Sequence, residues 1–124
     1  RRKLPPDAYS FSAAISSCEK GKRWEMALQL LADMRRRELE PSVVGYSAAI
    51  SSCEKSRQWE AALALLADMR QHGPLPEIIS YNAAISACEK GTQWERALAL
   101  LRSMQEVGPT PNHISYSAAI SACE

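Results

Sequence analysis

A strict internal period constrains what this chain can fold into. Three residue types recur every 35 residues without an insertion: an aromatic residue at Phe11, Tyr46, Tyr81 and Tyr116, a cysteine at Cys18, Cys53, Cys88 and Cys123, and a tryptophan at Trp24, Trp59 and Trp94. A fixed period of roughly 20 to 50 residues is typical of solenoid proteins. A single unit of this size cannot bury its apolar face, so neighbouring units have to stack.

The spacing of apolar residues predicts two helices in each unit. In residues 78–112, one face of a helix is formed by Tyr81, Ala84, Ile85 and Cys88 at positions i, i+3, i+4 and i+7. We expect Ser80 to be its N-cap residue and Gly91 to end it.

A second helix is expected directly after the first. Thr92 and Glu95 have the spacing of a capping box. A second stripe at helical spacing then consists of Trp94, Ala97, Leu98, Leu101 and Met104, and it is followed by the helix-breaking residues Gly108, Pro109 and Pro111. Each unit is therefore predicted to be a helical hairpin, and the stripe predicts the tryptophans and methionines to be core residues.

The period divides the chain into a predicted series of segments. They are a basic linker or the end of a preceding repeat (1–7), three complete repeats (8–42, 43–77 and 78–112) and the first helix of a truncated repeat (113–124). The apolar face of that last helix (Tyr116, Ala119, Ile120, Cys123) lacks a second helix to cover it. We expect a truncated chain, a missing segment, or another protein subunit over this face.

Composition excludes several classes of function. A formal net charge of +1 does not indicate a strongly basic nucleic-acid-binding protein. The cysteines share one register, with no Cys-x-x-Cys pair and no nearby histidine, which favours buried structural thiols over disulfides or zinc. No stretch is apolar for long enough to span a membrane. We find no catalytic constellation and expect neither an enzyme nor a cofactor.

The repeat resembles the pentatricopeptide repeat. The residues that carry the resemblance are an aromatic-Asn pair at Tyr81-Asn82, the run Ala97-Leu98-Ala99-Leu100-Leu101, Met104, and the closing residues Gly108, Pro111 and Asn112, with equivalents in the other copies. The resemblance covers Ala8 to Glu124. It implies an all-α fold, a right-handed α-solenoid superhelix of helix-turn-helix repeats.

The resemblance also implies a function and a set of site residues. In this family one repeat meets one nucleotide of single-stranded RNA, and the base is recognised by the residue after the first aromatic and by the last residue of the repeat. Here the base-reading pairs are Ser12 with Ser42, Ser47 with Glu77, and Asn82 with Asn112, while Ser117 has no partner. Asn82 with Asn112 resembles a pyrimidine reader that favours cytosine, and a serine after the aromatic favours a purine. Base-stacking residues would be Tyr9, Val44, Ile79 and Ile114.

Lysines at the end of each first helix complete the implied site. Lys20, Lys55 and Lys90 match a family lysine that approaches the phosphate backbone. The alternative is that each pairs with the glutamate before it, as a solvated surface pair. The run Arg35-Arg36-Arg37 is interpreted as a solvated helix end, because Glu38 and Glu40 follow it.

Two functions remain open. The first is a sequence-selective single-stranded RNA-binding module in RNA processing, stability or editing in a mitochondrion or plastid, as the resemblance implies. The second is a protein-interaction solenoid, or a structural subunit of a larger ribonucleoprotein assembly. Near-neutral charge and a small number of repeats favour the second.

Overall fold

The computed structural model describes residues 8–124, and the predicted linker at 1–7 lies outside them. The described part contains seven helices and no strand, which confirms the predicted all-α solenoid. They are α1 (Ala8–Lys20), α2 (Trp24–Arg36), α3 (Val43–Lys55), α4 (Trp59–His72), α5 (Ile78–Lys90), α6 (Trp94–Val107) and α7 (His113–Ala122). None of these helices has the length and apolar character needed to cross a bilayer.

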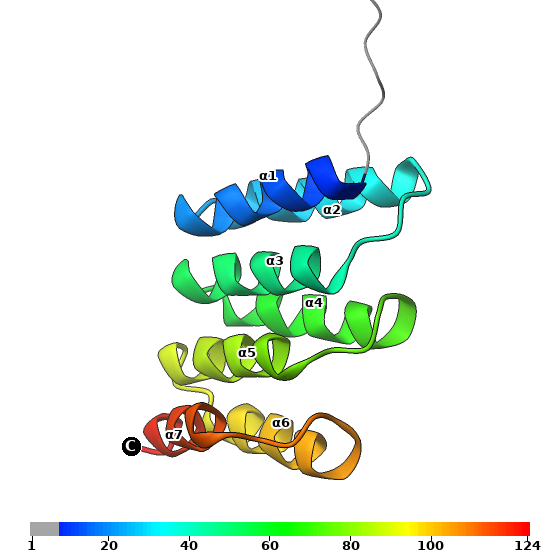
Figure 1. Cartoon of the computed structure of the whole chain (residues 1–124). Coiled ribbons are helices and arrows are strands. Elements are labelled where there is room, and N and C mark those ends of the chain that lie inside the picture. Colours follow the sequence, from blue (N-terminus) through cyan, green and yellow to red (C-terminus); the bar gives the residue numbers. More distant parts are fainter. Residues whose placement is uncertain (1–7) are drawn as a thin grey trace, which may run out of the picture.

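The helices form two layers (Figure 1). The first helices of the hairpins, α1, α3, α5 and α7, lie one after another in one layer, and α2, α4 and α6 form the second layer behind them. Each first helix contacts the next first helix directly, whereas each second helix contacts only the first helices on either side of it in the chain. Buried Ala48 and Ala83 carry only a methyl group, which allows first helices to approach closely.

The core follows the predicted stripes. Tyr46, Tyr81, Ile50 and Ile85 are buried on the first helices, and the methionines Met34, Met69 and Met104 are buried on the second. The tryptophans depart from the prediction of core residues, because Trp24 and Trp59 are only half-buried and Trp94 is 49% exposed. Each tryptophan is the first residue of its helix, where a large ring reaches the edge of the layer.

Both predicted N-terminal helix caps are wrong. The first helix of 78–112 begins at Ile78 with Glu77 in the N-cap position, so Ser80 lies inside the helix and is buried. The second begins at Trp94 after Gln93, which makes no side-chain cap hydrogen bond, so Thr92 and Glu95 form no capping box.

Gly91 caps the end of α5 as predicted, and the next residue makes the turn between the two helices. Thr92 has a φ of 56°, its N–H donates to the Glu89 carbonyl, and the Gln93 N–H donates to the Cys88 carbonyl. This is the hydrogen-bond pattern of a Schellman motif. Lys22 and Arg57 hold the same positive φ in the two preceding turns, so each hairpin turns at a residue that carries a side chain.

The apolar face of α7 is largely uncovered, as expected. Tyr116, Ile120 and Cys123 are exposed. Ala119 differs from the expectation because it is buried, together with Ala122, on the side of α7 that contacts α5.

The thiols of Cys18, Cys53 and Cys88 are free and buried, which confirms them as core residues. Burial raises the pKa of both Cys53 and Cys88 from 9.0 to about 11, because a thiolate loses its hydration there. A raised folded-state pKa means that the unfolded chain ionises first. The contribution of these two buried thiols to the free energy of unfolding is therefore fully present below pH 9 and is lost as the pH rises from 9 to about 11.

This difference in burial predicts thiol reactivity. At pH 8, a thiol-specific reagent should modify Cys123 rapidly and leave Cys53 and Cys88 unmodified until the chain unfolds. Mass spectrometry of peptides taken during the reaction measures the order. Rapid modification of Cys53 in the folded chain would contradict its burial.

Candidate functional site

The predicted base-reading residues lie along the junctions between consecutive first helices. We call these junctions seam 1 (α1 with α3), seam 2 (α3 with α5) and seam 3 (α5 with α7). At seam 1 the two hydroxyl groups of the predicted pair meet, with Ser12 Oγ 3.1 Å from Ser42 Oγ. Ser42 Oγ also accepts a hydrogen bond of 3.1 Å from the Gly45 N–H and so caps α3. Seam 1 therefore brings its predicted pair together.

Seam 3 brings together the third predicted pair. Asn82 Nδ2 donates to Asn112 Oδ1 over 3.2 Å. Asn112 is also the N-cap residue of α7, forming a reciprocal capping box with Ser115. The Ser115 hydroxyl donates to Asn82 Oδ1. These contacts fix the orientation of both amides, and an ordered amide presents its remaining donors and acceptors in set directions.

Seam 2 does not bring its predicted pair together. Ser47 Oγ lies 2.8 Å from Ser80 Oγ, and both residues are buried. Glu77 is exposed and makes no cap hydrogen bond to α5. Ser47 instead meets the residue 33 positions further along the chain, Ser80. The equivalent residue at seam 1 is Gly45, which has no side chain, and at seam 3 it is Ser115, which bonds Asn82 while Asn82 keeps its contact with Asn112.

The predicted stacking residues form an exposed apolar row beside the seams. Val44 and Ile79 are 62% exposed and Ile114 is 50% exposed, each on the first turn of its helix. The side chain of Tyr9 lies outside the part of the chain that the structure describes. Ser117 is exposed on α7.

The predicted phosphate-contacting lysines connect neighbouring repeats. Lys55 Nζ lies 2.7 Å from Glu19 Oε2, and Lys90 forms the same ion pair with Glu54. We call these two ion pairs the Glu–Lys ladder. The hydrogen bond to Glu19 raises the pKa of Lys55. The expected alternative, a pair between adjacent residues, is thus replaced by pairs 36 residues apart, and Lys20 is in no ion pair within residues 8–124.

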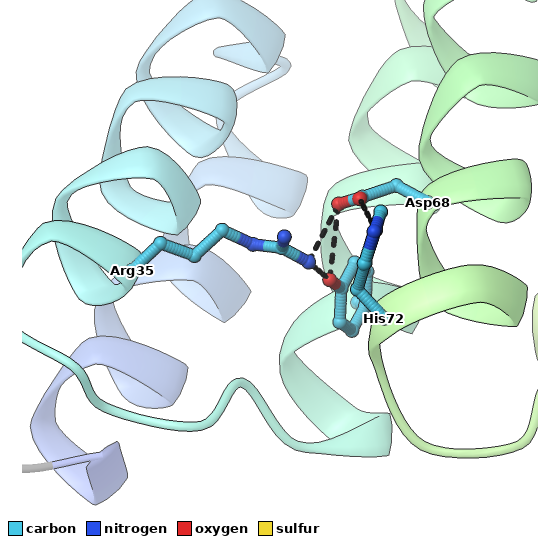
Figure 2. A network of polar contacts seen from close by, with 4 residues as sticks. Arg35, Asp68 and His72 are labelled. Atoms are coloured by element: carbon cyan, nitrogen blue, oxygen red, sulfur yellow. Dashed lines mark hydrogen bonds and ion pairs between the residues drawn. The ribbon is translucent and has the colours of Figure 1, made fainter.

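A polar network that the sequence analysis missed joins the helices α2, α3 and α4. Arg35 of α2 forms an ion pair of 2.7 Å with Asp68 of α4, and Asp68 also contacts His72 Nδ1 at 3.2 Å (Figure 2). The Tyr46 hydroxyl of α3 donates to Asp68 over 3.0 Å and accepts from Arg35. Arg35 is therefore a structural residue, not part of a solvated helix end.

A signal for this network is present in the sequence. Arg35, Arg70 and Gln105 each precede a tyrosine by 11 residues. Gln105 Nε2 donates to the Tyr116 hydroxyl over 3.2 Å, so a contact at the same spacing recurs between α6 and α7.

The seams offer hydroxyl and amide groups rather than catalytic groups. Such groups can donate to and accept from the edge of a base. No cluster of histidine, cysteine or acidic residues with the geometry of a metal site occurs in the described residues. The geometry defines a class of protein, a solenoid of helical hairpins with polar side chains at the junctions between its first helices.

Comparison with known families identifies the solenoid. The pentatricopeptide repeat domain model matches residues 1–56 and 29–91, and the PPR repeat family model matches residues 76–124. The chain belongs to the pentatricopeptide repeat family. No curated protein matches its sequence.

Solved structures of the pentatricopeptide repeat protein PPR10 have a similar fold. Two crystal structures of PPR10 in complex with an 18-nt psaJ RNA element, one of them a cysteine-to-serine variant, match with a TM-score of 0.84 at 24% identity, covering 98% of this chain. PPR10 from maize matches with a TM-score of 0.70 at 28% identity, covering 95% of this chain. This chain spans only 17–18% of the length of those proteins.

Proposed function

We propose that this chain binds single-stranded RNA, with one nucleotide at each of the units 8–42, 43–77 and 78–112. The observation that carries the proposal is the contact between Asn82 and Asn112, two ordered amides beside the exposed side chains of Ile79 and Ile114. The family and the RNA complexes of PPR10 support RNA as the ligand class.

Base selection is strongest at unit 78–112 in this proposal. The Asn82 and Asn112 amides select a pyrimidine with a preference for cytosine, while Ile79 and Ile114 pack against the faces of the base. Unit 8–42 reads through Ser12 and Ser42 and favours a purine. Unit 43–77 discriminates little, because the Ser47 hydroxyl already bonds Ser80.

Phosphate contacts are proposed at the lysine row. In this proposal Lys20 can approach a phosphate directly. Lys55 and Lys90 can do so only when their ion pairs with the glutamates break, or when one ammonium group donates to a phosphate and to its glutamate at the same time. Neutralised phosphates make affinity fall as salt rises. We therefore expect a shallow salt dependence, set mainly by Lys20.

The biological setting that we propose is RNA processing, stability or editing in a mitochondrion or plastid. The chain acts by occupying its RNA site and performs no chemistry of its own. A protein-interaction solenoid is the second candidate, and the paired state of Lys55 and Lys90 favours it, because paired lysines attract phosphate weakly.

A double substitution tests base reading directly. Asn82→Thr with Asn112→Asp should move the preferred base at unit 78–112 from cytosine to guanine, changing the affinity ratio about tenfold, or about 1.4 kcal/mol. Aspartate is a good N-cap residue, so α7 keeps its cap. Fluorescence anisotropy with short single-stranded RNAs that differ at one base, across a salt series, measures the ratio.

Thr110→Asp is the matched control, because it adds the same negative charge two residues away from Asn112 and outside the seam. It should leave the base preference unchanged. A folded double variant that binds RNA with the wild-type preference would contradict base reading by these two residues. Absence of RNA binding by the wild-type chain at low salt would contradict the proposed function itself.

A further inference from the structure

A groove of about 800 Å³ lies at the loop ends of the second hairpin and the third. Its walls include Arg70 from α4, Leu75 and Glu77 from the following loop, Tyr81 from α5 and Val107 from α6. Leu75 is 83% exposed and Val107 is 72% exposed. Two such apolar side chains beside one groove form a surface that water solvates poorly. We call this site the α4–α6 groove.

The equivalent place one repeat earlier shows what the polar groups of the groove can bind. There the Asp68 carboxylate accepts a hydrogen bond from the Tyr46 hydroxyl and forms an ion pair with Arg35. Moving each residue by 35 positions gives Arg70, Tyr81 and Ser103. The arginine and the tyrosine are retained, but the carboxylate is replaced by the shorter hydroxyl of a serine.

The two retained donors are consequently unoccupied in this part of the structure. Among residues 8–124, Arg70 takes part in no ion pair, and the Tyr81 hydroxyl makes no hydrogen bond. The Tyr81 side chain is only 2% exposed, yet no buried side-chain oxygen in the described residues lacks a partner. The hydroxyl therefore reaches the surface of the groove, where a ligand can accept from it.

The walls of the groove also carry fewer charged side chains than the walls of the equivalent pocket one repeat earlier. The equivalent pocket one repeat earlier has a volume of about 350 Å³ and is lined by Arg35, Glu38, Glu40 and His72 together with Leu39 and Pro41. Thirty-five residues later, Glu40 corresponds to Leu75 and His72 corresponds to Val107. The α4–α6 groove is thus larger and apolar, and it keeps one cation.

We propose that the α4–α6 groove binds an extended segment of a partner protein in which an acidic side chain neighbours a bulky apolar one. The carboxylate takes the place that Asp68 has one repeat earlier and contacts the Arg70 guanidinium and the Tyr81 hydroxyl. The apolar side chain packs on Leu75 and Val107. Glu77 at the wall favours a segment whose remaining residues are neutral or basic.

A protein segment fits this chemistry better than RNA does. The groove has a single cation, two exposed aliphatic side chains and one carboxylate, whereas a phosphate backbone requires several cations in a row. The groove includes Glu77, the predicted reading residue of unit 43–77, but neither Asn82 nor Asn112 lines it, so partner binding leaves the reading pair of unit 78–112 accessible.

Two peptide pools test the proposal. Both are short labelled peptides with random flanks, one with a central Leu-Glu-Leu and the other with Leu-Gln-Leu. The acidic pool should bind the wild-type chain at least about tenfold more tightly, because a charge-assisted contact is lost with glutamine. Arg70→Gln should remove this difference, and Leu75→Ser should weaken both pools.

Ser103→Asp provides the sharpest variant. It restores the carboxylate of the earlier repeat, so the chain occupies its own site, and binding of the acidic pool should fall at least about tenfold. Ser103→Asn is the matched control of equal size without charge, and it should bind the acidic pool like the wild type. Far-ultraviolet circular dichroism of both variants checks that the helices are intact.

Three results would overturn the proposal. The first is equal binding of the two pools by the wild-type chain. The second is unchanged binding by a folded Ser103→Asp variant. The third is a different occupant: self-association of the chain that Ser103→Asp abolishes, or RNA affinity that Leu75→Ser abolishes.

Discussion

Replacing Met69 with alanine should lower the free energy of unfolding by about 3 kcal/mol. Met69 is fully buried on α4, the middle helix of the second layer. Removing its side chain leaves a cavity between helices that have little freedom to close it, because each is held by neighbours on both sides. A solenoid is stabilised by contacts between adjacent units, so a defect in the middle weakens both junctions.

Urea unfolding followed by circular dichroism measures this loss. Met26→Ala is the matched control, because Met26 is 45% exposed on α2, and we expect a change of less than about 0.5 kcal/mol. A loss below about 1 kcal/mol for Met69→Ala would show that the second layer is not packed as described.

Two glycine-to-alanine substitutions at equivalent turns should change stability in opposite directions. At Gly91 a Cβ atom would overlap the indole ring of Trp59 in the preceding repeat. The backbone itself accepts alanine, with φ of −91° and ψ of 6°, so the cost comes from the overlap. Moving the ring also disturbs its stacking with Arg96, whose guanidinium lies 4.9 Å from the ring centroid. We expect a loss of about 2 kcal/mol.

Gly21 occupies the same turn position two repeats earlier, and a Cβ atom added there would overlap no neighbouring atom. The nearest atom to its Cβ atom would be in the Arg23 side chain at 3.6 Å, an ordinary contact. Gly21→Ala should therefore stabilise the chain by about 0.5 kcal/mol, because alanine restricts the unfolded state. Thermal unfolding of both variants under the same conditions measures the difference. Equal effects at the two positions would contradict the packing of Trp59 on Gly91.

The hairpin architecture could be predicted because it depends on periodicity. The 35-residue repeat and the apolar spacing determine which residues of each helix are buried, and Cys53 and Met69 occupy the core as that spacing requires. Burial at helix ends is less predictable. Trp94 shares the apolar stripe but is the first residue of α6, so the stripe alone does not reveal its exposure.

Contacts between repeats could not be predicted from local sequence. Lys55 has a glutamate directly before it in the chain, but it pairs with Glu19, which stacking brings close from the preceding repeat. Serine is a common N-cap residue, yet Ser80 lies inside α5, where its hydroxyl group contacts that of Ser47. Both outcomes depend on the distance between first helices, which no single repeat specifies.

The double duty of Ser42 and Asn112 limits how recognition by this chain can change. Each side chain holds the start of the next helix and also lies beside the proposed base-reading residue of its own unit. Only a short side chain with an acceptor oxygen can both cap the helix and contact a base, so serine, threonine, asparagine and aspartate are the suitable residues. A change of base preference through these two positions is therefore restricted to these four residue types, because any other residue would remove the N-cap of the following helix.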